Sequence, residues 1–346
     1  MMRRWIFFLL MLLLFGIAVL ELLYRFQVVD CYRGELHRNT KAGDLREFEG
    51  RKTLLIMGDS FAARPDTFAS GLDSALDGDW RTINSAVGGT GIVQARIMAP
   101  GRFRKFRPSL FLYQIYVGND LFDLRYPTNW GKAAVPRNFY WMVSRNFRSL
   151  AWLNYKAGQM WAGMSRRWTG RAKPAPVYRP EKDVFSPDRF TRRDRIHARA
   201  HPSLVADSVL LRGRPGRIFE EYLHEIDRLL KECRPNECRP ILLVVPHFSQ
   251  MGPGAAENAR RIGLEVPRDP KYYSPNYPFV LGLKEYLRKI RPEGVLINPL
   301  EEFHREDVQG HRLYYQRDSH LNPIGQGLLG EIVRRELRNL GENEAG

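Results

Sequence analysis

The sequence is poor in the residues that build metal centres and disulfide scaffolds. Its 346 residues include three cysteines, Cys31, Cys233 and Cys238, a set too sparse for a zinc site. The acidic and histidine residues between positions 301 and 311 have no recognisable ligand spacing either. Cys233 and Cys238 flank a short Arg-Pro-Asn-Glu turn, so they could form a local disulfide outside the cytoplasm. Cys31 is assigned no role.

Acidic residues are also scarce relative to basic ones. The chain has 54 Lys plus Arg against 38 Asp plus Glu, a formal net charge of +16. Such a balance favours anionic partners, which include nucleic acid, phospholipid headgroups and acidic polymers. The first 24 residues discriminate among these partners.

The N-terminal segment lacks a polar face. Arg3 and Arg4 precede an apolar run from residue 5 to 20 that continues past Glu21 to Tyr24, close to the ~20 residues that a bilayer core requires. Gly16 offers only a weak cleavage site, so we expect an uncleaved anchor over 5–24 rather than a signal peptide or a buried helix. This predicts a single pass through the inner (cytoplasmic) membrane, with residues 1–4 in the cytoplasm.

Everything after residue 24 is then expected in the periplasm or another extracytoplasmic space, which argues against a nucleic-acid partner. Residues 25–51 are polar and aperiodic, as a tether would be. From 52 to 340 the sequence alternates between short apolar runs (about 52–57, 81–83, 110–117, 241–245 and 294–297) and helical patterns (about 66–76, 92–98, 218–230, 279–290 and 324–340). This alternation predicts one α/β domain with a parallel, doubly wound sheet of five strands.

Residues 126–215 interrupt the alternation, and we interpret them as an insertion over the active-site edge. Tryptophan is interleaved with Arg and Lys from 138 to 168, which predicts one or two amphipathic helices. These helices could lie on a membrane surface or pack on the core, and packing is the favoured reading. The proline- and arginine-rich stretch from 173 to 214 is predicted to be loop.

A candidate nucleophile follows the first strand. Four apolar residues, 54–57, lead into Gly58, Asp59 and Ser60, and glycine permits a sharp turn there. Ser60 therefore lies at the carboxyl end of a strand, where open α/β sheets bind ligands. Its hydroxyl is a nucleophile if a base reaches it, and otherwise a helix cap.

Other polar residues converge on the same edge. Gly89 lies in a glycine-rich loop after the second strand, Asn119 follows the third, and Asp318 and His320 precede the last helix. His320 can act as the base for Ser60, and Asp318 can orient its imidazole. The amides of Ser60 and Gly89 and the side chain of Asn119 can form an oxyanion hole.

These blocks, in this order, resemble the SGNH (GDSL-type) hydrolase superfamily. The resemblance covers about residues 52 to 338 apart from the insertion, and Asn84 and Gln94 also fit the glycine block of bacterial membrane-anchored members. It implies a flavodoxin-like three-layer α/β/α sandwich and serine-based acyl-ester hydrolysis or transfer, with no metal or other cofactor. Carried over to this sequence, the catalytic residues are Ser60, Asp318 and His320.

The late block departs from the common family pattern, because a single residue separates Asp318 from His320. With Asn322 and Pro323 next, this spacing is similar to that of alginate O-acetyltransferase-type proteins, which act on exported polysaccharides but usually have Trp where this chain has Leu321. We therefore expect a membrane-tethered esterase that removes O-acyl groups, acetyl foremost, from an envelope glycan or a small ester. The alternatives are an O-acyltransferase and a non-catalytic binding or assembly module. No oligomeric state is predicted.

Competing sites are weaker. The Gly89-x-Gly91 pattern could indicate dinucleotide binding, but Gln94 occupies the third glycine position. His247, after the fourth strand, could contact substrate, although an ordinary loop histidine is the favoured reading. Asp59 and Asp120 are expected to be turn and loop hydrogen-bonders rather than catalytic acids.

Overall fold

Five parallel strands form the centre of the protein. The structure, a computed structural model, describes residues 2–46, 50–64, 66–76, 80–125, 135–168 and 178–345. The strands are β1 (Lys52–Met57), β2 (Trp80–Asn84), β3 (Leu110–Tyr116), β4 (Arg239–Val245) and β5 (Val295–Ile297). Their order in the sheet is β2-β1-β3-β4-β5, and every pair is parallel. This is the flavodoxin-like order, so the predicted fold class is confirmed.

Helices surround the sheet. They are α1 (Met2–Arg25), α2 (Arg33–Asn39), α3 (Ala42–Arg46), α4 (Ile92–Phe106), α5 (Asp120–Arg125), α6 (Val135–Asn146), α7 (Arg148–Trp168), α8 (Arg192–Ala200), α9 (Leu204–Leu210), α10 (Gly213–Leu230), α11 (Pro253–Arg261), α12 (Pro270–Tyr273), α13 (Pro278–Ile290), α14 (Leu300–Val308) and α15 (Pro323–Ala345). Short 3-10 helices are η1 (Leu72–Ala75), η2 (Pro180–Lys182), η3 (Pro187–Arg189) and η4 (Phe248–Gln250).

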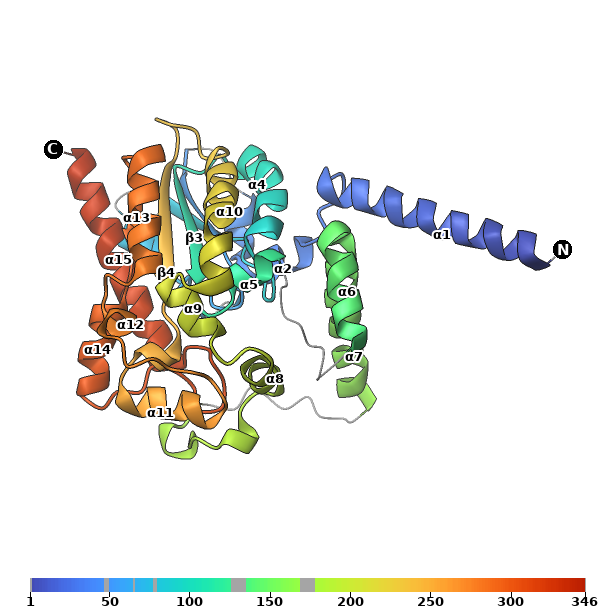
Figure 1. Ribbon diagram of the computed structural model, residues 1–346. Coiled ribbons are helices and arrows are strands. Elements are labelled where there is room, and N and C mark those ends of the chain that lie inside the picture. The colour runs from blue at the N-terminus through green and yellow to red at the C-terminus, as the bar shows by residue number, and fades with distance from the viewer. Residues whose placement is uncertain are drawn as a thin grey trace.

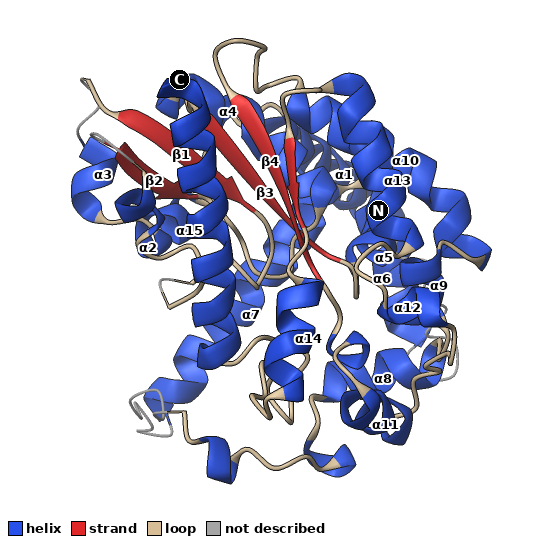
Figure 2. Cartoon of the chain, turned by 90° about the vertical axis from the view of Figure 1, so that its left-hand side faces the viewer, coloured by secondary structure: helices blue, strands red, loops and turns tan. Residues whose placement is uncertain are grey.

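Two helical layers enclose the sheet. Helices α4, α10 and α13 form one layer and contact one another in sequence order, whereas α15 crosses the other face together with η1 (Figure 2). Strands β1 to β4 are buried along almost their whole length. Because both faces are covered, these strands appear in the sequence as unbroken apolar runs rather than alternating ones.

The N-terminal helix α1 projects away from the domain (Figure 1). Residues 3–25 are long and apolar enough to cross a membrane, and little of their surface is buried by the protein. The following segment, expected to be an aperiodic tether, instead contains α2 and α3, which pack beside β2. Thr40 exchanges hydrogen bonds with the backbone of Asn84, and buried Arg81 donates to the carbonyl of Asp44.

Two predicted elements differ from the structure. The helix expected over 66–76 is reduced to η1, because Gly71 adopts a left-handed φ of 72° that interrupts a continuous helix. The loop expected over 173–214 contains α8 and α9. Of the one or two amphipathic helices expected over 138–168, two are present, α6 and α7. Residues 47–49 of the predicted tether and residues 126–134 and 169–177 of the predicted insertion lie outside the described residues.

The predicted local disulfide is present. Cys233 and Cys238 are bonded, with their Cα atoms 5.1 Å apart, within the usual range. Buried Arg291, just after α13, donates hydrogen bonds to the carbonyl oxygens of Leu230 and Cys238. The disulfide loop thereby joins the end of α10 to the start of β4.

The turn after β1 requires glycine for a reason that the sequence did not reveal. A Cβ atom on Gly58 would lie 2.6 Å from the side-chain oxygen of Gln114 and 2.8 Å from its Cβ. Gln114 is itself buried, and its oxygen accepts the backbone N–H of Asp59 at 3.0 Å. Close approach of β1 to β3, and not a positive φ, therefore fixes glycine at this position.

Replacing Gly58 with alanine is expected to destabilise the protein. The new methyl group must displace Gln114, an overpacking cost of about 1–3 kcal/mol. The matched control is Gly101→Ala in α4, where no atom lies within 4 Å of the added Cβ. That substitution should be neutral or stabilise by roughly 0.5–1 kcal/mol. Urea unfolding of the two variants measures the difference, and equal stabilities would contradict the packing argument.

Candidate active site

Ser60 lies where the sheet reverses its winding. Strand β1 has β2 on one side and β3 on the other, so the chain leaves β1 and β3 in opposite directions. Open α/β sheets bind ligands in the crevice that such a switch point creates. Ser60 follows β1, Asn119 follows β3, and both side chains line one cavity of about 170 Å³.

Local hydrogen bonds fix the turn that presents Ser60. One carboxylate oxygen of Asp59 accepts the backbone N–H of Phe61 at 2.9 Å. The side chain of Asn84, at the end of β2, donates to the carbonyl of Ala62 at 2.7 Å. Asp59 is buried, and burial raises the pKa of its carboxyl group. It has the turn-forming role expected from the sequence.

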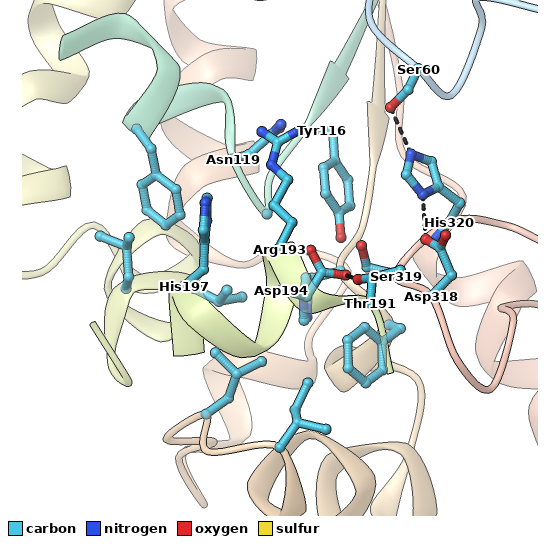
Figure 3. Close-up of a pocket in the computed structure, with 18 of the residues that line it drawn as sticks. Ser60, Tyr116, Asn119, Thr191, Arg193, Asp194, His197, Asp318, Ser319 and His320 are labelled. Carbon is cyan, nitrogen blue, oxygen red and sulfur yellow. Dashed lines mark hydrogen bonds and ion pairs between the residues drawn. The ribbon is translucent and has the colours of Figure 1, made fainter. Parts of the chain in front are cut away.

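The late Asp-x-His pair has the geometry that a serine mechanism requires. His320 Nε2 lies 2.7 Å from the Ser60 hydroxyl oxygen, and His320 Nδ1 is hydrogen-bonded to the carboxylate of Asp318. The same carboxylate oxygen accepts the backbone N–H of His320 at 3.0 Å. Figure 3 shows the three side chains in a row. Phe61 stacks on the imidazole with ring centroids 4.9 Å apart, which restrains its orientation.

Electrostatics favour a protonated imidazole at this position. Burial alone would lower the pKa of His320, but the hydrogen bond and charge of Asp318 outweigh it, so the pKa is raised above its ordinary value. Burial would likewise raise the pKa of Asp318, but its bonds to His320 lower it. Asp318 thus stays ionised while His320 accepts a proton, as the base and its orienting acid must.

Of the predicted oxyanion donors besides Ser60, the structure places one, Asn119, in the cavity and leaves Gly89 outside its lining. Asn119 lines the cavity beside Ser60, and Gly118 lines it as well. Gly89 adopts a φ of 75° in its loop and is not among the residues that line the cavity. Its neighbour Gly88 is nearer, because a Cβ there would lie 3.7 Å from the Cβ of Ser60. The oxyanion role of Gly89 therefore stays a prediction.

His247 lines the same cavity but bonds elsewhere. Its Nδ1 lies 2.6 Å from the hydroxyl oxygen of Ser249, and the ring stacks near Tyr116. Burial lowers the pKa of His247 to about 3, so the ring stays neutral. These contacts give it a structural position after β4, and the imidazole that reaches Ser60 is that of His320.

Asp120 also bonds within the fold. Its carboxylate accepts the backbone N–H of Tyr116 at 3.2 Å and the hydroxyl of Tyr222 at 3.1 Å. Burial raises its pKa well above the ordinary value. Together these bonds tie the loop after β3 to α10, as expected of a loop hydrogen-bonder. In the part of the chain that the structure describes, no group of three or more His, Cys, Asp or Glu could hold a metal ion.

Helix α8 supplies residues that the sequence analysis missed. Arg193, Asp194 and His197 line the cavity opposite the Ser60–His320 pair (Figure 3). Thr191 donates to the carboxylate of Asp194 at 2.7 Å, at the N-terminus of the helix. A threonine followed three residues later by an acid is a helix-start signal, and it could have revealed α8 inside the stretch predicted to be loop.

Comparison with known proteins adds fold neighbours. No family model matches the sequence, and no curated protein matches it. The structure of TesA is 13% identical, with a TM-score of 0.40, over 84% of this chain and 99% of that one. Axe2, an acetylxylan esterase from Geobacillus stearothermophilus, is 13% identical over 84% and 96% of the chains, with a TM-score of 0.38. LAE5, an alpha/beta hydrolase from the metagenome of Lake Arreo, is 12% identical over 83% and 96%, with a TM-score of 0.39. At such identities and scores, the functional argument rests on the geometry of the site.

Removing the Ser60 hydroxyl should abolish most turnover. We expect Ser60→Ala to lower kcat on 4-nitrophenyl acetate by a factor on the order of 10³ or more. Asn119→Ala should cost about 10² to 10³, as loss of one oxyanion donor does. Ser74→Ala is the matched control, because Ser74 is exposed and its hydroxyl donates to the nearby carbonyl of Gly71. Wild-type activity of Ser60→Ala on every ester tested would remove the serine mechanism.

The raised pKa of His320 sets the pH dependence. The neutral imidazole is the base, so kcat/KM should rise with pH through a midpoint above the ordinary histidine value of 6.5. In Asp318→Asn the negative charge is gone while burial remains, so the midpoint should move to lower pH and the plateau should fall by about 10⁴. An unchanged midpoint in Asp318→Asn would mean that another carboxylate orients His320.

Proposed function

We propose that the protein is a membrane-tethered serine esterase that removes short O-acyl groups, acetyl foremost, from a glycan of the cell envelope. The observation that carries the proposal is the 2.7 Å contact between Ser60 and His320, with Asp318 bonded to the other ring nitrogen. A non-catalytic module would not need three side chains from opposite ends of the chain in this arrangement.

The proposed reaction proceeds in two acyl transfers. The Ser60 oxygen attacks the ester carbonyl while His320 Nε2 takes the hydroxyl proton. Backbone N–H groups near Ser60 and the side-chain amide of Asn119 stabilise the negative oxygen of the tetrahedral intermediate. His320 then returns the proton to the departing alcohol, which leaves an acyl group on Ser60. A water molecule, deprotonated by His320, releases the acid.

The cavity supports a short acyl group. Its volume of about 170 Å³ is well below the roughly 300–1,000 Å³ of pockets that enclose a drug-sized ligand. Apolar side chains line one wall, among them Phe122, Leu204 and Leu264. These side chains suit a small alkyl group, and the sugar part of the substrate would stay outside.

Tethering and export are supported by the N-terminal helix and by the disulfide. Helix α1 begins with two arginines, and residues 3–25 are long and apolar enough to cross a membrane. Positive flanks of this kind stay in the cytoplasm, which supports an exported domain. A disulfide between Cys233 and Cys238 is stable in an oxidising compartment such as the periplasm. Both features suit a domain outside the inner membrane.

An O-acyltransferase is the second candidate, and one observation favours it. Helix α8 lines the cavity, and Ser60 is half-buried. Restricted water access lets a sugar hydroxyl compete for the acyl-enzyme. The two candidates share every step up to that intermediate.

A panel of 4-nitrophenyl esters, with and without sugar acceptors, tests the proposal. The esterase should release nitrophenol fastest from the acetyl ester, more slowly from butyryl and slowest from octanoyl, and an added oligosaccharide should leave the rate unchanged. A transferase should instead accelerate with the acceptor and yield an acylated sugar detectable by mass spectrometry. Preference for the octanoyl ester would contradict the small acyl pocket.

A further inference from the structure

The end of α1 is locked to the junction between α6 and α7. The Glu21 carboxylate accepts the backbone N–H groups of Arg148 and Ser149, at 3.0 and 2.8 Å. These are the first residues of α7, whose N–H groups have no partner within the helix. Arg25 donates to the carbonyl of Asn146, the last residue of α6, at 2.9 Å. The direction of α1 relative to the α6–α7 pair is thereby fixed.

One face of α7 packs on the segment that follows α1. Lys156 pairs with Glu35 of α2 at 2.7 Å, and the Trp152 indole donates to the carbonyl of Cys31 at 2.9 Å. This packing confirms the favoured reading of the amphipathic helices for that face, although the contacts are made with residues 31–35 rather than with the sheet.

The adjoining side of α7 is apolar and exposed. An outer stripe consists of Leu153, Met160, Trp161 and Met164, at spacings of seven, eight and eleven residues, which place them on one side of a helix. Met160 and Trp161 are 67% and 68% exposed. Further exposed apolar side chains lie on α6 (Phe139 and Met142) and in the turn after α1 (Phe26, Val28 and Val29). Several large apolar side chains exposed on neighbouring elements indicate an interaction site.

Charge and orientation identify the occupant. Residues 135–168 contain six Arg or Lys (at 137, 145, 148, 156, 166 and 167) and no Asp or Glu. Arg148 is buried and Lys156 pairs with Glu35, and the four other cations give this part of the sequence a positive charge that suits anionic lipid headgroups. Figure 1 shows the α6–α7 pair on the side of the domain from which α1 departs, with its axis across that of α1. If α1 spans the bilayer, the pair lies along the membrane surface rather than in it.

We propose that the α6–α7 pair is an interfacial membrane-binding element, whose outer stripe enters the headgroup region of the membrane that α1 spans. Apolar residues on one side and basic residues around them are the pattern of helices that lie in the interface plane. The protein is then held at two places, so the catalytic cavity keeps a fixed height above the bilayer. This inference does not depend on the proposed chemistry.

Depth measurements on the full-length protein test the proposal. Met160→Cys is labelled with an environment-sensitive dye and reconstituted in vesicles of phosphatidylcholine and phosphatidylglycerol. Nitroxide-labelled lipids should quench this dye, and its emission should shift to the blue. Val308→Cys is the matched control, because Val308 is an 88% exposed apolar residue of α14, on the far side of the domain from α1 (Figure 1). Its dye should stay unquenched by lipid and accessible to aqueous iodide.

A second experiment introduces negative charges into the outer stripe. With Met160→Glu and Trp161→Glu together, a dye at Met164→Cys should lose its lipid quenching, while circular dichroism and thermal unfolding stay as in the wild type. Equal iodide access at 160 and 308 would overturn the proposal. So would a blue-shifted dye at 160 that lipid nitroxides do not quench, because that result would show the stripe buried against a second copy of the chain.

Discussion

The hydrogen bond between Ser60 and His320 joins two segments that are 260 residues apart. The arrangement of the candidate active site depends on this contact. One partner belongs to the turn after β1 and the other to the loop before α15. Asn322 accepts the backbone N–H of Gly325 at 3.0 Å and so caps α15 directly after the histidine. The side chain of Gln326 bonds to backbone groups of Phe61 and Phe68. The start of α15 is thereby bonded to the loop that carries the serine.

The remaining wall of the site comes from the insertion. Thr191 donates its backbone N–H to the carbonyl of Arg317 at 2.9 Å, and the backbone of Gln316 donates to Asp183 at 3.0 Å. Arg317 reaches the carbonyl of Lys182 at 2.6 Å. The loop that carries Asp318 is therefore held between the sheet and the insertion, which explains how α8 comes to face the serine.

The sequence predicted the parts of this arrangement that local signals specify. Buried parallel strands are continuous apolar runs, so all five were found, and Asn322 and Pro323 marked the start of the last helix. The position of α8 could not be predicted, because the bond from Thr191 to Arg317 that fixes it joins residues far apart in the chain. The requirement for glycine at position 58 could not be predicted either, because it arises from the close approach of Gln114 on β3.

The N-terminal helix and the Trp- and Arg-rich helices were likewise predictable only in part. The composition of the first 24 residues indicated an anchor, and the interleaved Trp and Arg of the insertion left two readings open. In the structure, α7 packs on protein through Trp152 and Lys156 and exposes Met160 and Trp161 on the adjoining side. The bond from Glu21 to the start of α7, which joins α1 to the α6–α7 pair, links residues far apart in the chain and could not be predicted from the sequence.

Covalent labelling tests the central claim, that His320 activates Ser60, most directly. Intact protein treated with diisopropyl fluorophosphate and digested for mass spectrometry should carry one phosphoryl adduct, on the peptide that contains Ser60, because an organophosphate reacts with a serine that an adjacent base activates. The adduct should disappear in His320→Gln. An absence of adduct on folded wild-type protein, or equal labelling of His320→Gln, would contradict the account.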